Sequence, residues 1–143
     1  MARIEIELPE KFIFSTEIPI IINYIDRGNH LSYDSILPMM EEARIRFMQS
    51  IDYPQENING VGFIVTDVAV VYIRPGRHGQ VLKIELTPTD FSSKGCDFLY
   101  RISNSETGEE IARSKMGVVF FDYPGHKIVT VPEDFINTVH QLG

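Results

Sequence analysis

A single long helical pattern, from about Ser32–Asp34 to about Ser50, constrains the fold of this chain more than any other feature. Apolar residues recur in it at spacings of three and four, the period of a helix with one buried face. The stripe is too broad to lie against water, so other parts of the chain must cover it. Pro38 is tolerated best in a first turn, so the helix is expected to begin late or to bend early. The stripe consists of Ile36, Met39, Met40, Ala43, Phe47 and Met48.

Most of the remaining chain has β-strand patterns. Residues 12–24 are rich in Ile and Phe and predict a first strand, which Pro19 interrupts. Within it, the run 20–22 is typical of a strand covered on both faces. Turn sequences at 75–79 and 104–108 predict two adjacent hairpins, and therefore an antiparallel meander. The later strands are predicted at 62–73, 81–87, 98–103 and 110–121, and a short surface helix is predicted from Pro132.

These patterns predict an α+β domain in which an antiparallel β-sheet wraps around one long central helix. From pattern alone this is one option among several. A ferredoxin-like domain fits less well, because only one long helical pattern precedes the last four strands. A chain of 143 residues is long enough for one domain with a substantial core, so a single domain over residues 1–143 is expected.

Charge and composition narrow the function classes. The formal net charge of −7 argues against a general nucleic-acid binder, which would normally carry a basic face. The single cysteine, Cys96, is expected to be a small, partly buried strand residue, and nothing requires an oxidising compartment. No apolar run approaches the roughly 20 residues that span a bilayer, and the N-terminus lacks the apolar segment of a signal peptide. We therefore expect no membrane span and a cytoplasmic location.

The turn before the helix carries the residues with the clearest chemical meaning. Asp26 and His30 lie four residues apart in a turn that contains Gly28. A carboxylate beside the N–H groups of a helix start can act as base or nucleophile while those N–H groups hold an oxyanion. Simpler roles stay open, because an aspartate before a glycine is often only a turn former, and Ser32 or Asp34 could cap the N-terminus of the helix.

The segment 24–34, followed by 39–44, resembles the active-site segment of hot-dog-fold acyl-CoA thioesterases of the 4-hydroxybenzoyl-CoA thioesterase family. The resemblance continues at 67–80, 91–94, 108–113, 118–122 and 131–135, and so covers most of the chain. The chain departs from the family pattern at several positions, including Asn29, where many members have glycine. A missing glycine could change the backbone path near the substrate.

The resemblance implies a hot-dog fold and assigns roles to individual residues. Asp26 would be the general base or nucleophile, the N–H of Tyr33 would polarise the thioester carbonyl, and His30 would orient one of the reacting groups. Lys94 matches the segment that faces coenzyme A, and Arg74 and Arg77 could complete a basic cluster for its phosphates. Arg113 is a further candidate for that cluster. No spacing argues for a metal, and no cofactor is expected because coenzyme A enters as part of the substrate.

The expected function is therefore hydrolysis of an acyl-CoA thioester to a carboxylic acid and free coenzyme A. A non-catalytic module that binds acyl thioesters, or an interaction module on the same fold, is the alternative, since a fold alone does not define an activity. A hot-dog dehydratase fits less well, because its His-and-Glu arrangement is not evident. Residues 63–72 form a long apolar strand with few charges that would protect an open edge. A homodimer or homotetramer with active sites shared between chains is expected.

Overall fold

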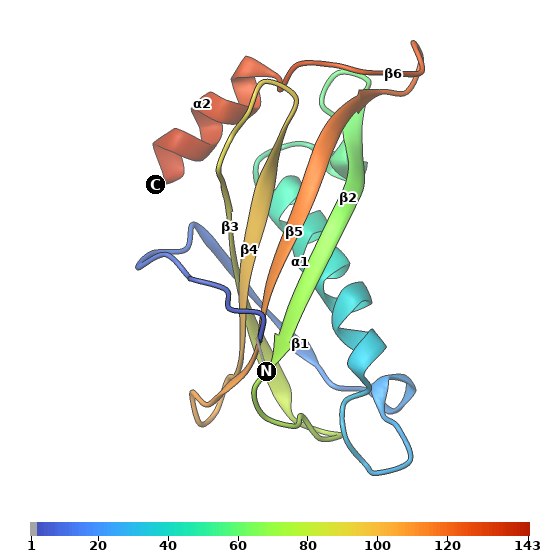
Figure 1. Ribbon diagram of the computed structural model, residues 1–143, viewed down its shortest axis with the longest axis vertical. Helices are drawn as coiled ribbons and strands as arrows, with labels where there is room; N and C mark the ends of the chain where they lie inside the picture. Colours follow the sequence, from blue (N-terminus) through green and yellow to red (C-terminus); the bar gives the residue numbers. More distant parts are fainter. Residues whose placement is uncertain (1–2) are drawn as a thin grey trace.

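The computed structural model describes residues 3–143, in which an antiparallel sheet curls around one long helix (Figure 1). The strands are β1 (Phe14–Pro19), β2 (Val61–Tyr72), β3 (Val81–Thr89), β4 (Gly95–Asn104), β5 (Glu110–Asp122) and β6 (Lys127–Ile128). Their order in the sheet is β1-β3-β4-β5-β2, and the short β6 pairs with β5. This is the α+β arrangement expected from the sequence, but the turn at 75–79 does not close a hairpin as predicted, because β2 pairs with β5 and β3 pairs with β1 and β4. The helices are α1 (Ile36–Ser50) and α2 (Glu133–Leu142), with 3-10 turns η1 (Ile22–Tyr24), η2 (Tyr33–Ser35) and η3 (Pro54–Glu56).

Helix α1 buries its apolar stripe against the inner face of the sheet. Every member of the predicted stripe is at most 1% exposed. The helix begins at Ile36, directly after η2, so Pro38 falls in its first turn, where no intrahelical partner is lost. Inner-face residues of β3 and β4 complete the core, and all of them are fully buried: Leu82, Ile84, Leu86, Phe98, Tyr100 and Ile102.

Helix α2 covers one end of this core. Its buried residue Phe135 packs against Phe63 and Phe120, with ring centroids 6.0 and 5.5 Å away. In Figure 1 it lies beside the turn between β3 and β4, at the end of the sheet opposite to the η1–η2 loop. Apolar side chains of α2 therefore cover the core at one end of the sheet, and the loops that contain Asp26 lie at the other end.

The first strand is shorter than predicted. Residues 12–24 do not form one strand, because β1 ends at Pro19 and the chain then turns through η1. Proline has no N–H with which to continue the ladder. The expectation that residues 20–22 are covered on both faces is also wrong: Ile20 is 1% exposed, but Ile21 and Ile22 are 46% and 65% exposed.

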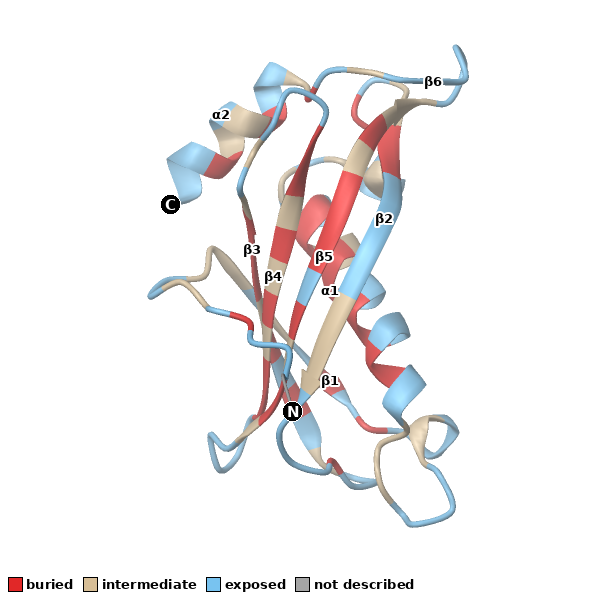
Figure 2. Cartoon of the chain, in the orientation of Figure 1, coloured by how far each residue is buried: buried red, intermediate tan, exposed pale blue. Residues whose placement is uncertain are grey.

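Strand β2 forms an open edge of the sheet. It pairs with β5 on one side, and its register shifts at a bulge between Val65 and Asp67. Figure 2 shows much of β2 in pale blue and tan, whereas β4 and β5 contain long buried stretches. Apolar side chains along it are substantially exposed, including Val65 at 43%, Val68 at 39% and Tyr72 at 51%. The prediction of an apolar edge strand is confirmed, and we call this surface the β2 edge.

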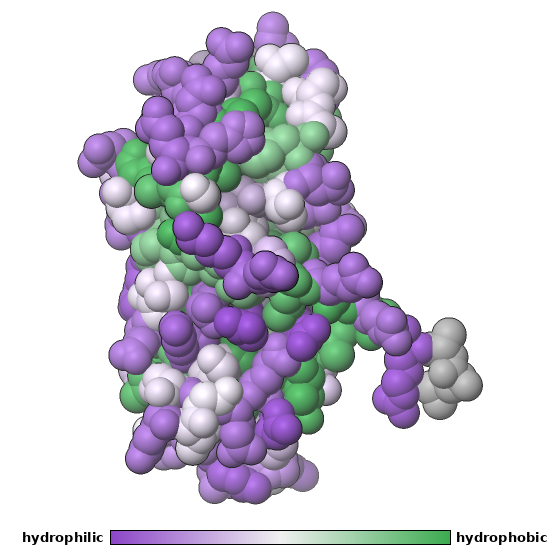
Figure 3. Space-filling view, turned by 90° about the vertical axis from the view of Figure 1, so that its left-hand side faces the viewer, coloured by the Kyte–Doolittle hydropathy of each residue, from purple (hydrophilic) through white to green (hydrophobic). Residues whose placement is uncertain are grey.

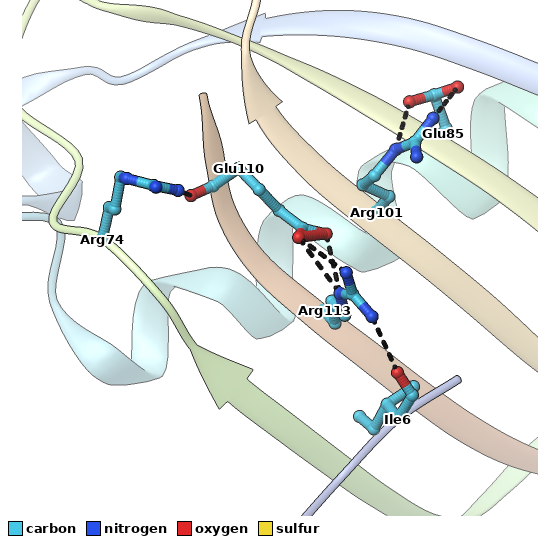
Figure 4. Close-up of polar contacts among 6 residues, drawn as sticks. All are labelled: Ile6, Arg74, Glu85, Arg101, Glu110 and Arg113. Carbon is cyan, nitrogen blue, oxygen red and sulfur yellow. Dashed lines mark hydrogen bonds and ion pairs between the residues drawn. The ribbon is translucent and has the colours of Figure 1, made fainter. Parts of the chain in front are cut away.

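The side view in Figure 3 shows a surface of mixed character, in which hydrophilic side chains are interrupted by hydrophobic areas. On the outer face of the sheet, charged side chains are paired with one another. Arg101 and Glu85 form a two-pronged ion pair, and Arg113 pairs with Glu110 and donates to the carbonyl of Ile6 (Figure 4). Among residues 3–143, no helix is long and apolar enough to cross a bilayer.

Candidate active site

Asp26 organises the turn that contains it. Its Oδ1 accepts hydrogen bonds from the backbone N–H groups of Gly28, at 2.9 Å, and of His30, at 3.2 Å. The backbone N–H of Asp26 donates to the carbonyl of His30 at 2.9 Å, which closes the turn. Both side-chain bonds use Oδ1, so within residues 3–143 the second oxygen, Oδ2, accepts no hydrogen bond. The carboxylate is exposed, and this second oxygen is available to water or substrate.

Asn29 takes the backbone conformation that glycine usually supplies. Its φ is 59°, in the left-handed region. Asparagine tolerates this region better than most residues. The departure from the family pattern at this position therefore leaves the tight turn intact.

The start of the helical segment carries uncapped N–H groups. Ser32 and Ser35 occupy the N-cap positions of η2 and α1, but neither makes a side-chain cap hydrogen bond. The Ser32 hydroxyl donates instead to the carboxylate of Asp34. The prediction that Ser32 or Asp34 caps this helix start is therefore wrong. Within the described chain, the N–H groups of Tyr33 and Asp34 have no acceptor and can bind a partial negative charge.

Asp26 and Tyr33 border an open groove of about 370 Å³. The groove lies between the Asp26 turn, η2 and the end of β2. The backbone N–H of Leu31 donates to the carbonyl of Gly76 at 2.7 Å, which holds the turn against the β2–β3 loop. The structure thus brings Asp26, His30 and Tyr33 together. The groove is lined by Asp26, His30, Leu31, Tyr33, Ile36, Tyr72, Ile73, Arg74, Pro75, Gly76 and Ile111.

Tyr72 is a groove residue that the sequence analysis did not identify. Its hydroxyl donates to the backbone carbonyl of Tyr33. Burial, together with the nearby Asp34 and Tyr33, raises the pKa of the Tyr72 phenol above its ordinary value. No sequence signal pointed to Tyr72, because the hydrogen bond joins the last residue of β2 to a helix start 39 residues earlier in the chain.

The three basic candidates lie in different places. Arg74 lines the groove, but its side chain donates to the carbonyl of Glu110 at 3.0 Å (Figure 4) and pairs with Glu109 at 3.3 Å. Arg77 is exposed in the β2–β3 loop, near the groove but outside its lining. Lys94 is exposed in the β3–β4 turn, at the opposite end of the sheet. Within a single chain, these three basic side chains therefore do not form one cluster.

A second hollow, of about 430 Å³, lies at the beginning of β2 and is lined in part by Gly62, Phe63 and Tyr123. The groove and this hollow are thus at opposite ends of the same edge strand. In the described part of the chain, no three His, Cys, Asp or Glu side chains are arranged to hold a metal ion.

Comparison with known proteins gives the family and the fold. The sequence model of the thioesterase-like superfamily matches residues 21–139. No curated protein sequence matches the chain. A 1,4-dihydroxy-2-naphthoyl-CoA thioesterase from Synechocystis is similar in structure, with a TM-score of 0.81 and 21% identity over 90% of this chain and 96% of that one. A thioesterase from Thermus thermophilus, solved with coenzyme A and Zn, has the same TM-score and identity over 94% and 96%.

A 12:0-ACP thioesterase from Umbellularia californica is also similar, with a TM-score of 0.75 and 14% identity, over 94% of this chain but 55% of that one. At these identities the likenesses show the fold, and they confirm the predicted hot-dog arrangement. Membership follows from the family match, which spans the Asp26 turn, α1 and most of the sheet. The chain belongs to the thioesterase-like superfamily.

Proposed function

We propose that this protein is a cytoplasmic acyl-CoA thioesterase of the 4-hydroxybenzoyl-CoA thioesterase type. One observation carries the proposal: a carboxylate with a free oxygen, on Asp26, and a free backbone N–H, on Tyr33, border the same groove. Thioester hydrolysis needs both, one to supply or activate the nucleophile and the other to stabilise the tetrahedral oxyanion. The superfamily match supports this reaction class.

The reaction follows from these groups. Asp26 either attacks the thioester carbonyl or removes a proton from the water that attacks it. The carbonyl oxygen becomes an oxyanion, which accepts a hydrogen bond from the N–H of Tyr33. Collapse of this intermediate breaks the carbon–sulfur bond, and coenzyme A leaves as the thiol after taking up a proton. If water attacked, the carboxylic acid is released directly; if Asp26 attacked, the acyl group stays on Asp26 as an anhydride, which water then hydrolyses to the acid and free Asp26. His30, at the end of the same turn, would orient the water or the carbonyl.

Coenzyme A is the proposed carrier of the acyl group. The related thioesterase from Thermus thermophilus was solved with coenzyme A, which supports this choice. Arg74 and Arg77, on the groove side, would attract the phosphates. Lys94 would do so only from a second chain, because it lies at the far end of its own sheet.

We also propose that the working unit is a homodimer, or a tetramer made of such dimers. An open, apolar edge strand favours pairing with another chain. If two β2 edges pair antiparallel, the beginning of one strand lies beside the end of the other. The hollow of one chain, and the end of its sheet that carries Lys94, would then lie beside the partner's groove. Each site would be lined by both chains.

A non-catalytic acyl-thioester-binding module is the second candidate. It is favoured by the two bonds that Asp26 Oδ1 accepts, because they are the bonds of an ordinary turn-forming aspartate. In that case the groove would bind acyl-CoA without turnover.

Asp26→Asn separates the two candidates. An asparagine keeps an Oδ1 acceptor for the turn but cannot act as base or nucleophile. We expect kcat toward a panel of acyl-CoAs, followed by released thiol, to fall at least about a hundredfold with substrate binding retained. Asp122→Asn is the matched control, because Asp122 also accepts a turn N–H, from Gly125 at 3.2 Å. A variant at Asp26 with near-normal kcat would move the chemistry elsewhere, and a wild-type protein that binds without turnover would favour the second candidate.

A further inference from the structure

Within residues 3–143, Tyr72 makes the one side-chain hydrogen bond to the peptide that follows Tyr33. Its hydroxyl, at the end of β2, donates to the Tyr33 carbonyl, across the groove from the Asp26 turn. That carbonyl and the N–H of Asp34 belong to the same planar peptide group. A bond that fixes the carbonyl therefore also fixes the direction in which the Asp34 N–H points.

The peptides before it are held by backbone bonds to other segments, whereas the Tyr33–Asp34 peptide is the first of the 3-10 turn η2. The Leu31 N–H donates to Gly76 at 2.7 Å, and the Ser32 N–H donates to Tyr24 at 2.8 Å. The side chain of Tyr33 is 75% exposed, so it is not packed into the core. The N–H groups of Tyr33 and Asp34 are thus two successive free donors. The Tyr72 hydroxyl binds the carbonyl of the peptide group that contains the second of them.

The bond also polarises the donor. A hydrogen bond accepted by a peptide carbonyl draws electron density toward the oxygen and makes the N–H of the same peptide a stronger donor. Oxyanion stabilisation depends on donors that are fixed in place before the charge develops, because they then need no reorganisation during the reaction. A phenol held by a β-strand is a rigid support for such a donor.

We propose that Tyr72 is a positioning residue of this site, which holds the Tyr33–Asp34 peptide so that both free N–H groups serve as oxyanion donors. The proposal rests on the proposed thioesterase function and adds to it a second donor, the Asp34 N–H, and the residue that aims it. A phenol keeps its proton near neutral pH, and the raised pKa of Tyr72 extends the range in which its hydroxyl is a donor toward higher pH.

Tyr72→Phe tests the proposal, because it removes the hydroxyl and keeps the ring. We expect kcat to fall about tenfold or more, since small displacements of groups around a reacting centre can cost up to about a hundredfold. KM and the binding of a non-hydrolysable acyl-CoA thioether should stay within about twofold, because the donors act mainly in the transition state. The amide nitrogen resonance of Asp34 should shift, as measured by NMR on the variant without substrate.

Ser114→Ala is the matched control. The Ser114 hydroxyl also donates to a backbone carbonyl of β2, that of Ala69 at 3.0 Å, but in the core and away from the groove. This variant should lower Tm without lowering kcat. An equal loss of kcat in both variants would mean that Tyr72 acts only through the stability of β2, and would overturn the proposal.

The outcomes also separate this inference from the proposed function. Unchanged kcat in Tyr72→Phe, or an unmoved Asp34 resonance, overturns the positioning role while wild-type turnover still supports the thioesterase. Raised KM with normal kcat makes Tyr72 a binding residue and likewise overturns it. Absence of wild-type turnover defeats the proposed function and with it the catalytic role of Tyr72, whatever the resonance shows.

Discussion

Cys96 shows how strongly position governs the chemistry of one side chain. It lies in β4, is 5% exposed and, as predicted, is a small buried strand residue. Burial raises the pKa of its thiol to about 12, and the negative charge of the neighbouring Asp97 acts in the same direction. The thiolate is the reactive form of cysteine, so this thiol is inert in the folded protein near neutral pH.

Alkaline pH should destabilise the protein partly through this residue. The unfolded thiol loses its proton near its ordinary pKa of 9.0, whereas the folded thiol keeps its proton until about pH 12. The folded state binds more protons between these values, so the free energy of unfolding falls as pH rises from 9.0 toward 12. We expect Tm to fall over this window, and to fall less steeply in Cys96→Ala. Tyr100, whose pKa burial also raises, keeps part of the effect in the variant. Equal slopes for wild type and variant would contradict this account.

Helix α1 places two arginines in opposite environments. Arg44 is 6% exposed and pairs with Glu56 through Nε at 2.6 Å and Nη2 at 3.1 Å, with its guanidinium 5.7 Å from the ring centroid of Phe63. Burial opposes its charge, but the bonds to Glu56 raise the pKa of Arg44 above its ordinary value. Arg46, two residues later, pairs with Glu42 on the exposed face at 2.7 Å.

Removing the acidic partner should therefore have very different effects in the two pairs. Glu56→Gln leaves the Arg44 charge buried without a counter-charge, which typically costs about 3–5 kcal/mol. Glu42→Gln weakens an exposed pair and should cost less than about 1 kcal/mol. Urea unfolding followed by circular dichroism measures both. Similar losses would show that the Arg44–Glu56 pair is as well solvated as the surface pair.

Local sequence patterns predicted helix α1 and its buried face. They did not predict hydrogen bonds and ion pairs that depend on where other side chains lie in the folded chain. The α1 stripe followed from spacing because burial repeats with the helical period. Arg44 occupies a position on that stripe, four residues after Met40, but nothing local showed that Glu56 would reach it. The predicted caps failed for a similar reason, since the Ser32 hydroxyl met the Asp34 carboxylate in place of a backbone N–H.

The candidate site divides in the same way. The turn that contains Asp26 and His30 was predictable because its residues are close together in the sequence. The hydrogen bond from Tyr72 to Tyr33 joins the end of an edge strand to a helix start, and the spacing of residues in the sequence does not predict such a contact. The placement of Lys94 at the far end of the sheet likewise depends on the length of β3 and the path of its loops.

At the scale of the whole molecule, the β2 edge is the least complete surface. Its exposed apolar residues and unpaired backbone groups are a template for another strand. The predicted dimer or tetramer would cover them. A charge introduced on such an edge normally protects it from pairing.

Val68→Lys should therefore shift the protein toward a monomer of 16.3 kDa, measured by light scattering at micromolar concentration. If both chains line each site, activity should fall with the dimer fraction. Leu142→Lys is the matched control, because Leu142 is similarly exposed, 43% against 39%, but lies at the end of α2. An active wild-type monomer would reject the shared site.

The pairing of β1 with β3 and of β2 with β5 has a consequence for the newly made chain. As the ribosome releases the protein, the Asp26 turn and β2 emerge long before the strands that hold them. Neither closure of the sheet nor assembly of the groove can be completed until β5 has left the exit tunnel, because long-range strand pairing must wait for both partners. During that interval the apolar β2 is unprotected on both sides, which is when such a chain most needs a chaperone.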